Sequence, residues 1–159
     1  MTKTDSEKIT VESPQDTSLL KLPEAPSLQS NSVRVLPTSE SLLGTGAWTA
    51  SGSGPDMNLK GRWYTLTLSP GRPIPAGASV SLFVWEWNVF ATLPKDFVAY
   101  LVHDDTGHFL NVSRAMSGNV MLAPGYSASS TWTYWFGVIG SGVLVPPVFG
   151  LTDKIIVNY

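Results

Sequence analysis

The sequence FVAYLVHDDTGHFLNVSR, residues 97–114, decides the fold class. Aromatic and β-branched residues, which favour extended strands, predominate on both sides of the polar segment Asp-Asp-Thr-Gly at residues 104–107. In that segment aspartate is a good turn former, and glycine adopts a positive φ without steric cost. The stretch therefore predicts an antiparallel hairpin with strands at residues 97–104 and 108–114.

Short β-rich runs of the same kind recur from residue 47 to the C-terminus, separated by Gly, Pro, Asn and Asp. The segment Ser-Gly-Asn at residues 117–119 is interpreted as a second tight turn, which extends the hairpin into a three-stranded meander. The pattern predicts an all-β fold, an antiparallel β-sandwich of the jelly-roll or Greek-key type with about eight strands. The expected strands are residues 47–52, 62–69, 78–88, 97–104, 108–114, 119–123, 131–138, 143–148 and 154–158.

The N-terminal part of the chain has a different composition. Residues 1–40 contain ten charged side chains and no aromatic residue, whereas all aromatic residues lie between Trp48 and Tyr159. A segment so poor in bulky apolar groups cannot offset the entropy lost on ordering. We therefore expect a flexible, disordered polar extension at residues 1–45 in front of a β-sandwich domain at residues 46–159. Within the extension, residues 32–36 have the composition of a marginal edge strand.

Charge and composition exclude several classes of function. The net charge is -2, which gives the chain no electrostatic attraction to nucleic acid. The absence of cysteine excludes disulfides, a thiolate nucleophile and a Cys-based zinc site. No apolar run is long enough to predict a transmembrane segment or a signal peptide, so we expect cytoplasmic synthesis with leaderless release as one alternative.

The aromatic residues supply the candidate binding site. Alternation puts Phe83, Trp85 and Trp87 on one face of their strand, opposite Val80 and Val84. If the aliphatic face lines the core, the aromatic face is an exposed ladder on which sugar rings stack; the alternative is a strand buried on both faces. We expect further outward aromatics in two neighbouring strands and a hydrogen-bonding amide beside the ladder. The predicted ligand-binding residues are Trp63, Phe83, Trp85, Trp87, Asn88 and Trp135.

Catalysis and metal binding have little support in the sequence. Both histidines, His103 and His108, flank the turn that contains Asp104 and Asp105, and ordinary turn chemistry accounts for this cluster. There is no Gly-x-Ser-x-Gly motif, and Glu86 is the single carboxylate in an aromatic setting. We therefore predict no enzyme, no metal and no cofactor.

The sequence favours a non-enzymatic, lectin-like recognition module that binds carbohydrate or a cell-surface glycoconjugate through exposed aromatics. One alternative is a subunit of a multimeric assembly, such as a capsid, tail or surface particle, with a homo-oligomeric interface. The other is a small membrane-active toxin. The stretch at residues 138–150, rich in Val, Gly and Pro, is either a buried crossover or an apolar surface that contacts lipid or a neighbouring subunit.

Overall fold

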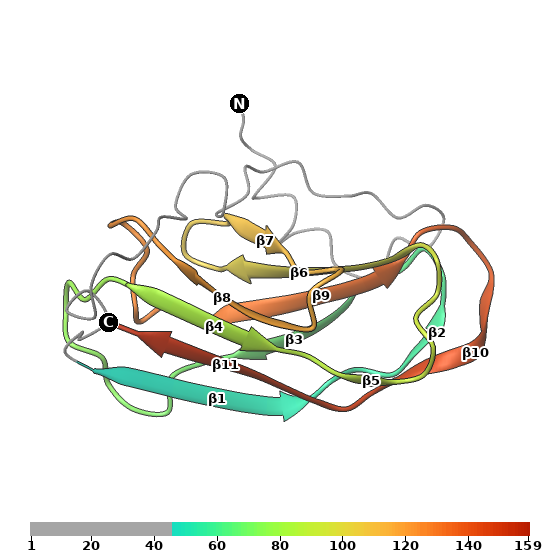
Figure 1. Cartoon of the computed structure of the whole chain (residues 1–159), viewed down its shortest axis with the longest axis horizontal. Helices are drawn as coiled ribbons and strands as arrows, with labels where there is room; N and C mark the ends of the chain where they lie inside the picture. The colour runs from blue at the N-terminus through green and yellow to red at the C-terminus, as the bar shows by residue number, and fades with distance from the viewer. Residues whose placement is uncertain (1–45) are drawn as a thin grey trace.

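The structure is a computed structural model that describes residues 46–159 (Figure 1). These residues form antiparallel strands in three sheets and no helix, which confirms the all-β prediction. The extension predicted at residues 1–45 lies outside the described residues. The strands are β1 (Ala47–Ser53), β2 (Met57–Leu59), β3 (Tyr64–Leu68), β4 (Leu82–Glu86), β5 (Val89–Phe90), β6 (Phe97–His103), β7 (Phe109–Asn111), β8 (Ser117–Met121), β9 (Trp132–Val138), β10 (Val143–Gly150) and β11 (Thr152–Asn158).

Two four-stranded sheets face each other and enclose an aromatic core. Their strand orders are β1-β11-β4-β8 and β3-β9-β6-β7 (Figure 1). Phe83 of β4 stacks on Trp132 of β9 with ring centroids 3.9 Å apart, and the centroid of Trp87 lies 5.9 Å from that of Phe136. These ring contacts join the two sheets, so packing holds together a domain that has no disulfide.

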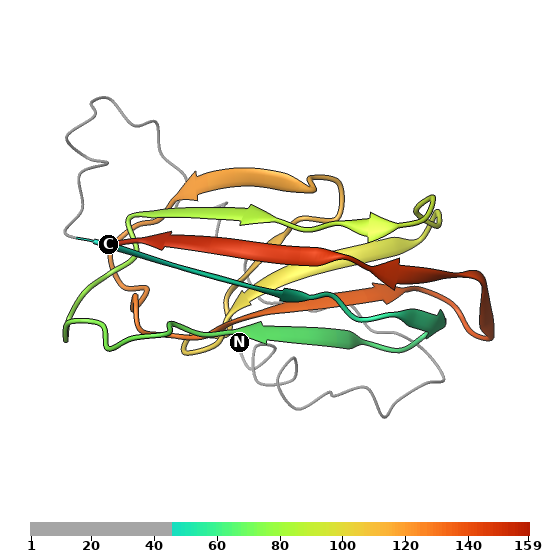
Figure 2. The same ribbon diagram turned by 90° about the horizontal axis from the view of Figure 1, so that it is seen from below.

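The third sheet, β2-β10-β5, continues the first sheet beyond a bend. Its order repeats the order β1-β11-β4, because β2 follows β1, β10 precedes β11 and β5 follows β4 in the chain. In Figure 2, β10 runs on into β11, and β5 follows β4 along the same line. At the bend the strands approach closely: a Cβ at Gly150 would lie 2.3 Å from the backbone of Gly54. Glycine at residue 150 is therefore what allows the bend to close.

Asp153 is buried directly beside this bend. Its Oδ1 accepts the backbone N–H of Asn88 at 3.0 Å, and its Oδ2 is buried with no hydrogen-bond partner among the described residues. Burial raises the pKa of the Asp153 carboxyl to about 7. The nearby Tyr134 hydroxyl donates to the backbone oxygens of Glu86 and Lys154, and burial together with the charge of Asp153 raises the pKa of Tyr134.

All nine predicted strands are present, but the predicted meander is wrong. The hairpin of β6 and β7 is confirmed, whereas β8 pairs with β4 in the opposite sheet. The predicted turn at residues 117–119 lies inside β8. Gly118 faces the ring of Trp85, where an added Cβ would lie 2.5 Å from Cζ2 of that ring. Glycine at residue 118 thus allows the Trp85 ring to pack closely against β8, and it does not form a turn.

The predicted exposed ladder is also wrong, because the faces of β4 are reversed. Phe83 and Trp87 are fully buried against the other sheet, while Val84 and Glu86 point away from the core. Alternation is interrupted at Ser81, whose backbone N–H bonds to Asn158 O before β4 begins. As a result Val80 and Phe83 are both buried, although uninterrupted alternation would place them on opposite faces of the strand. In β9, by contrast, alternation is regular, and Trp132, Tyr134, Phe136 and Val138 all lie in the core.

We expect Gly150→Ala to destabilise the domain, because the new methyl group would overlap the backbone of Gly54. Overpacking of this kind costs about 1–3 kcal/mol. Gly71→Ala is the control, since nothing lies within 4 Å of a Cβ there. Urea unfolding followed by tryptophan fluorescence measures both variants. Equal midpoints for the two variants would show that the bend does not depend on this contact.

We expect Asp153→Asn to remove a pH dependence of stability. The unfolded carboxyl ionises near 3.8 and the folded one near 7, so between these values the folded state holds the extra proton. The free energy of unfolding therefore falls as pH rises through this window, by up to about 1.4 kcal/mol per pH unit. The difference between wild type and variant, measured by urea unfolding at several pH values, isolates this group from Asp104. Parallel pH profiles would contradict the assignment.

Candidate functional site

The six predicted ligand-binding residues do not form one site. Phe83 and Trp87 belong to the core, and Trp63 and Trp135, each 5% exposed, pack against one another with ring centroids 5.4 Å apart. At these four positions the open aromatic face on which the prediction depended is absent, because Phe83 and Trp87 pack in the core between the sheets and Trp63 and Trp135 are buried in a separate cluster. Their role in ligand binding stays a prediction.

Asn88 has a structural position at the bend. Its backbone N–H is bonded to Asp153, and its Nδ2 donates to Glu86 Oε2 and to Thr152 O, both at 3.4 Å. The side-chain amide thus bonds Glu86 and the neighbouring strand β11, and its role in ligand binding stays a prediction. Trp85 alone of the six lines a surface hollow.

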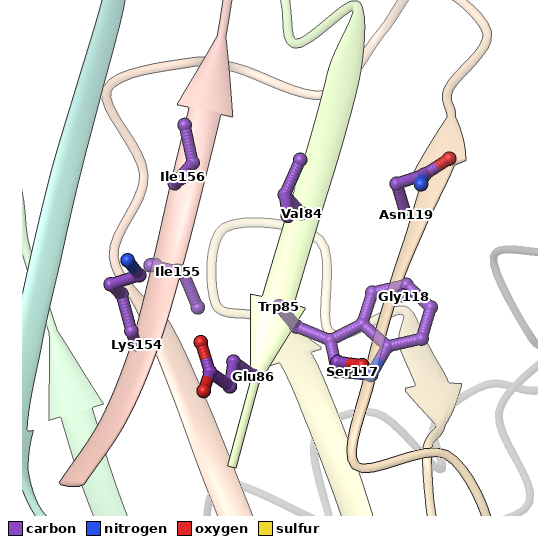
Figure 3. Close-up of a pocket in the computed structure, with 9 residues that line it drawn as sticks. All are labelled: Val84, Trp85, Glu86, Ser117, Gly118, Asn119, Lys154, Ile155 and Ile156. Atoms are coloured by element: carbon purple, nitrogen blue, oxygen red, sulfur yellow. The ribbon is translucent and has the colours of Figure 1, made fainter.

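This hollow lies on the outer face of β11, β4 and β8 (Figure 3) and has a volume of about 350 Å³. Lys154, Glu86 and Ser117 form one row across the three strands, and Ile156, Val84 and Asn119 form the next. The Trp85 ring lies on the core-facing side of β4, near the ring of Phe83 and over Gly118, and donates its indole N–H to Ala115 O at 2.9 Å. The hollow is shallow because small residues of β8 form one side of it.

The hollow offers polar contacts but no catalytic arrangement. It contains one cation and one carboxylate, with a serine and an asparagine, and no histidine lines it. Within residues 46–159 there is no group of three or more His, Asp or Glu side chains placed to hold a metal ion. The hollow therefore offers hydrogen-bonding groups to a surface ligand, and no imidazole lies among the residues that line it.

The histidine turn is a closed hydrogen-bond network. Buried His103 contacts Thr106 Oγ1 and Ser127 O, each at 3.0 Å, and burial lowers the pKa of His103. Asp104 Oδ2 accepts bonds from the hydroxyls of Thr131 at 2.5 Å and Thr133 at 2.8 Å, and burial raises the pKa of Asp104. His108 Nδ1 lies 2.8 Å from the Tyr126 hydroxyl. These partners hold the ends of β6 and β9 together.

An exposed apolar patch occupies the β2-β10-β5 end of the domain. The exposed fractions of its side chains are 81% for Val145, 70% for Phe90, 66% for Val143, and 45% for both Phe149 and Leu151. Phe90 of β5 and Phe149 of β10 are cross-strand partners, so their rings lie on the same face. We call these five residues the end patch. It is the largest concentration of exposed apolar side chains in the described part of the chain.

The sequence marked the end patch in part. Four of its five residues fall at positions 143–151, within or next to the stretch at residues 138–150 that was expected to be either a buried crossover or an apolar contact surface. The structure shows strand β10 there, with alternating buried Leu144 and exposed Val143 and Val145. Phe90 was missed because β5 has only two residues and gives no alternation to read.

Comparison with known proteins gives a family. The model of the family described as "Flagellar protein FlhE" matches residues 54–159. A solved structure described as "Crystal Structure of FLHE" is similar to this chain with a TM-score of 0.62 and 24% identity, over 72% of this chain and 96% of that chain. At this identity the likeness supports the fold. No match was found among curated proteins.

The family match overturns the predicted function. A lectin-like, carbohydrate-binding module is wrong, because the matching family is defined as a flagellar protein. The alternatives of a capsid, tail or surface-particle subunit and of a membrane-active toxin do not describe this family either. Its description names a cellular structure and no reaction. No helix within residues 46–159 has the length and apolarity to cross a membrane. The match covers two thirds of the chain, and the chain therefore belongs to the family of flagellar protein FlhE.

Proposed function

We propose that this chain acts in the flagellar system by binding a component of the flagellar apparatus through the end patch, without catalysing a reaction. The family supplies the setting, since it is described as a flagellar protein. The observation that carries the proposal is the exposure of the cross-strand partners Phe90 and Phe149, two large apolar side chains on the same face of the sheet. A protein rarely leaves such a surface open unless a partner covers it.

The end patch favours a partner that contacts side chains. Burying a phenylalanine completely is worth about 1.5–3 kcal/mol, so the exposed parts of Phe90 and Phe149 together supply a binding contribution of a few kcal/mol. Aromatic residues in the centre of an interface commonly dominate its binding energy. The edge strands of this sheet, β2 and β5, have three and two residues and are too short for a partner to extend the sheet by strand addition.

The absence of catalysis is supported by the placement of the reactive groups. The imidazole of His103 is buried and bonded on both nitrogens, and His108 is bonded to Tyr126. Among the described residues, neither histidine is therefore available to the serine of the hollow. The hollow is shallow and largely polar, whereas the end patch exposes apolar area whose burial favours binding.

The double substitution Phe90→Ser, Val145→Ser tests the proposal. We expect co-sedimentation of the purified full chain with purified flagellar basal bodies to weaken at least tenfold in this variant, because a hot-spot residue is worth about 1–2 kcal/mol or more. Met116→Ser is the matched control, since Met116 is also an exposed apolar residue and lies outside the end patch. Circular dichroism checks that both variants are folded. A folded double variant that binds as tightly as the control would refute the proposal.

A further inference from the structure

The outer edge of β8 is a second surface that the fold leaves for contact. In the order β1-β11-β4-β8 this strand stands at the end of its sheet, and none of the other described strands pairs with its outer side. In Figure 2, β8 lies at the margin of the sandwich, beside β4. An edge strand presents a row of backbone N–H and C=O groups that can pair with a strand of another molecule.

The backbone groups on this outer edge belong to Ser117, Asn119 and Met121. The preceding residue of even number bonds toward β4, because Met116 O accepts the backbone N–H of Trp87 at 2.8 Å. Successive residues of an antiparallel strand point their backbone groups to opposite sides, and the register with β4 is unbroken through the whole of β8. The odd-numbered residues therefore direct their groups away from β4. Ser117 and Asn119 are exposed, so this side of the strand is accessible.

β8 lacks the features that commonly protect an edge strand. Charged side chains, proline, a bulge or a very short length keep most exposed edges from pairing. Residues 115–123 contain no charged residue and no proline. β8 has five residues, and its register with β4 shows no shift. The strand is therefore regular, uncharged and long enough to pair.

The other edges of the two four-stranded sheets are less open. β7 has only three residues. β1 and β3 contact one another across the sandwich, as shown at Gly52 of β1, where a Cβ would lie 3.3 Å from Cδ1 of Leu66 in β3. In the described part of the chain, β8 thus offers the longest edge of these sheets without a neighbouring strand.

The sequence of β8 matches a second copy of itself. In an antiparallel pair centred on Asn119, all five residues of the strand find a partner: Ser117 lies opposite Met121 of the second copy, and Gly118 lies opposite Val120 of the second copy. None of these side chains is charged, so no like charges oppose each other at the edge. The two Asn119 side chains meet on the outer face, where each amide donates and accepts hydrogen bonds.

The hollow on the outer face adds complementarity of shape. Small residues of β8, Ser117 and Gly118, form one side of it (Figure 3). Met121 points to the same face as Ser117, because both are odd-numbered residues of one regular strand. In the centred register Met121 of the second copy lies beside Ser117, and a flexible methionine side chain fills an irregular gap well. A two-fold axis makes this contact twice.

We propose that β8 pairs antiparallel with β8 of a second copy of this chain, centred on Asn119, and joins the two β1-β11-β4-β8 sheets into one continuous sheet. The partner is this chain itself, and backbone hydrogen bonds together with the contact between Ser117 and Met121 hold the pair. This surface is separate from the end patch, and the proposal does not depend on the proposed function.

A single cysteine tests both the contact and its register. The chain has no cysteine, so Asn119→Cys places one thiol at the centre of the proposed pair. The two opposed Cα atoms lie about 5.5 Å apart in such a pair, which is within the reach of a disulfide. We expect the full-length variant to form a covalent dimer with a mild copper oxidant and to return to monomer on reduction.

The matched control is Ser117→Cys, at an exposed position of the same strand. In the proposed register its two Cα atoms lie four residues apart along the strands, more than about 13 Å, which no disulfide spans. We therefore expect little cross-linking of this variant. Equal cross-linking of the two variants, or none of Asn119→Cys, would overturn the proposal.

Sedimentation velocity measures the association without a cross-link. We expect the full chain to show a concentration-dependent equilibrium between monomer and dimer. Asn119→Lys sets two like charges against each other at the two-fold axis, so we expect the dissociation constant of the dimer to rise by about tenfold or more. Ser51→Lys is the matched control, because it adds the same charge at an exposed position of β1, the other edge strand of this sheet.

Circular dichroism checks that both lysine variants are folded. A wild-type chain that stays monomeric at every concentration would refute the proposal. A dimer that is weakened equally by the two lysine variants would also refute it, because the interface would then lie elsewhere.

Discussion

The stacking of Phe83 on Trp132 is the contact on which the rest of the domain depends. It joins β4, one of the two inner strands of one sheet, to β9 of the other sheet, and the ring centroids lie 3.9 Å apart. Without disulfides, a domain of this size relies on buried apolar area, and large rings supply more of it per residue than aliphatic side chains do. Because this stacking directs Phe83 into the core, the alternating residues Val84 and Glu86 point to the outer face of the sheet. Core packing thus decides which residues remain for contact with partners.

The bend between β11 and β10 separates a rigid sandwich from the surface proposed to bind. Gly54, Gly150 and buried Asp153 bring three strands together there, and the same three strands continue into the β2-β10-β5 sheet. Beyond the bend, β10 packs on the core through Leu144 and Val148, while Val145 and Phe149 on its other side remain exposed. The exposure of the end patch is therefore a consequence of the strand's alternation, because one face of β10 is turned away from the core.

Much of the fold followed from the sequence, while the site did not. Alternation and turn residues predicted nine of the eleven strands and the hairpin at Asp104–Gly107, because local pattern determines both. The pairing of β8 with β4 could not be read locally, since Gly118 serves a contact with Trp85 that lies 33 positions away in the chain. The buried state of Trp135 was missed because alternation identifies the two faces of a strand but does not tell how deeply the side chains on each face are buried.

The buried aromatic residues belong to the folded domain, whereas the end patch is the apolar surface that we assign to a flagellar partner. Hydroxyl-radical footprinting of the full chain, alone and bound to purified flagellar basal bodies, tests this assignment in a single measurement. The account predicts that Phe90 and Phe149 react in the free protein and become protected on binding, while Trp63 and Trp135 are unreactive in both states. Unchanged reactivity of Phe90 on binding, or rapid reaction of Trp135 in the free protein, would contradict it.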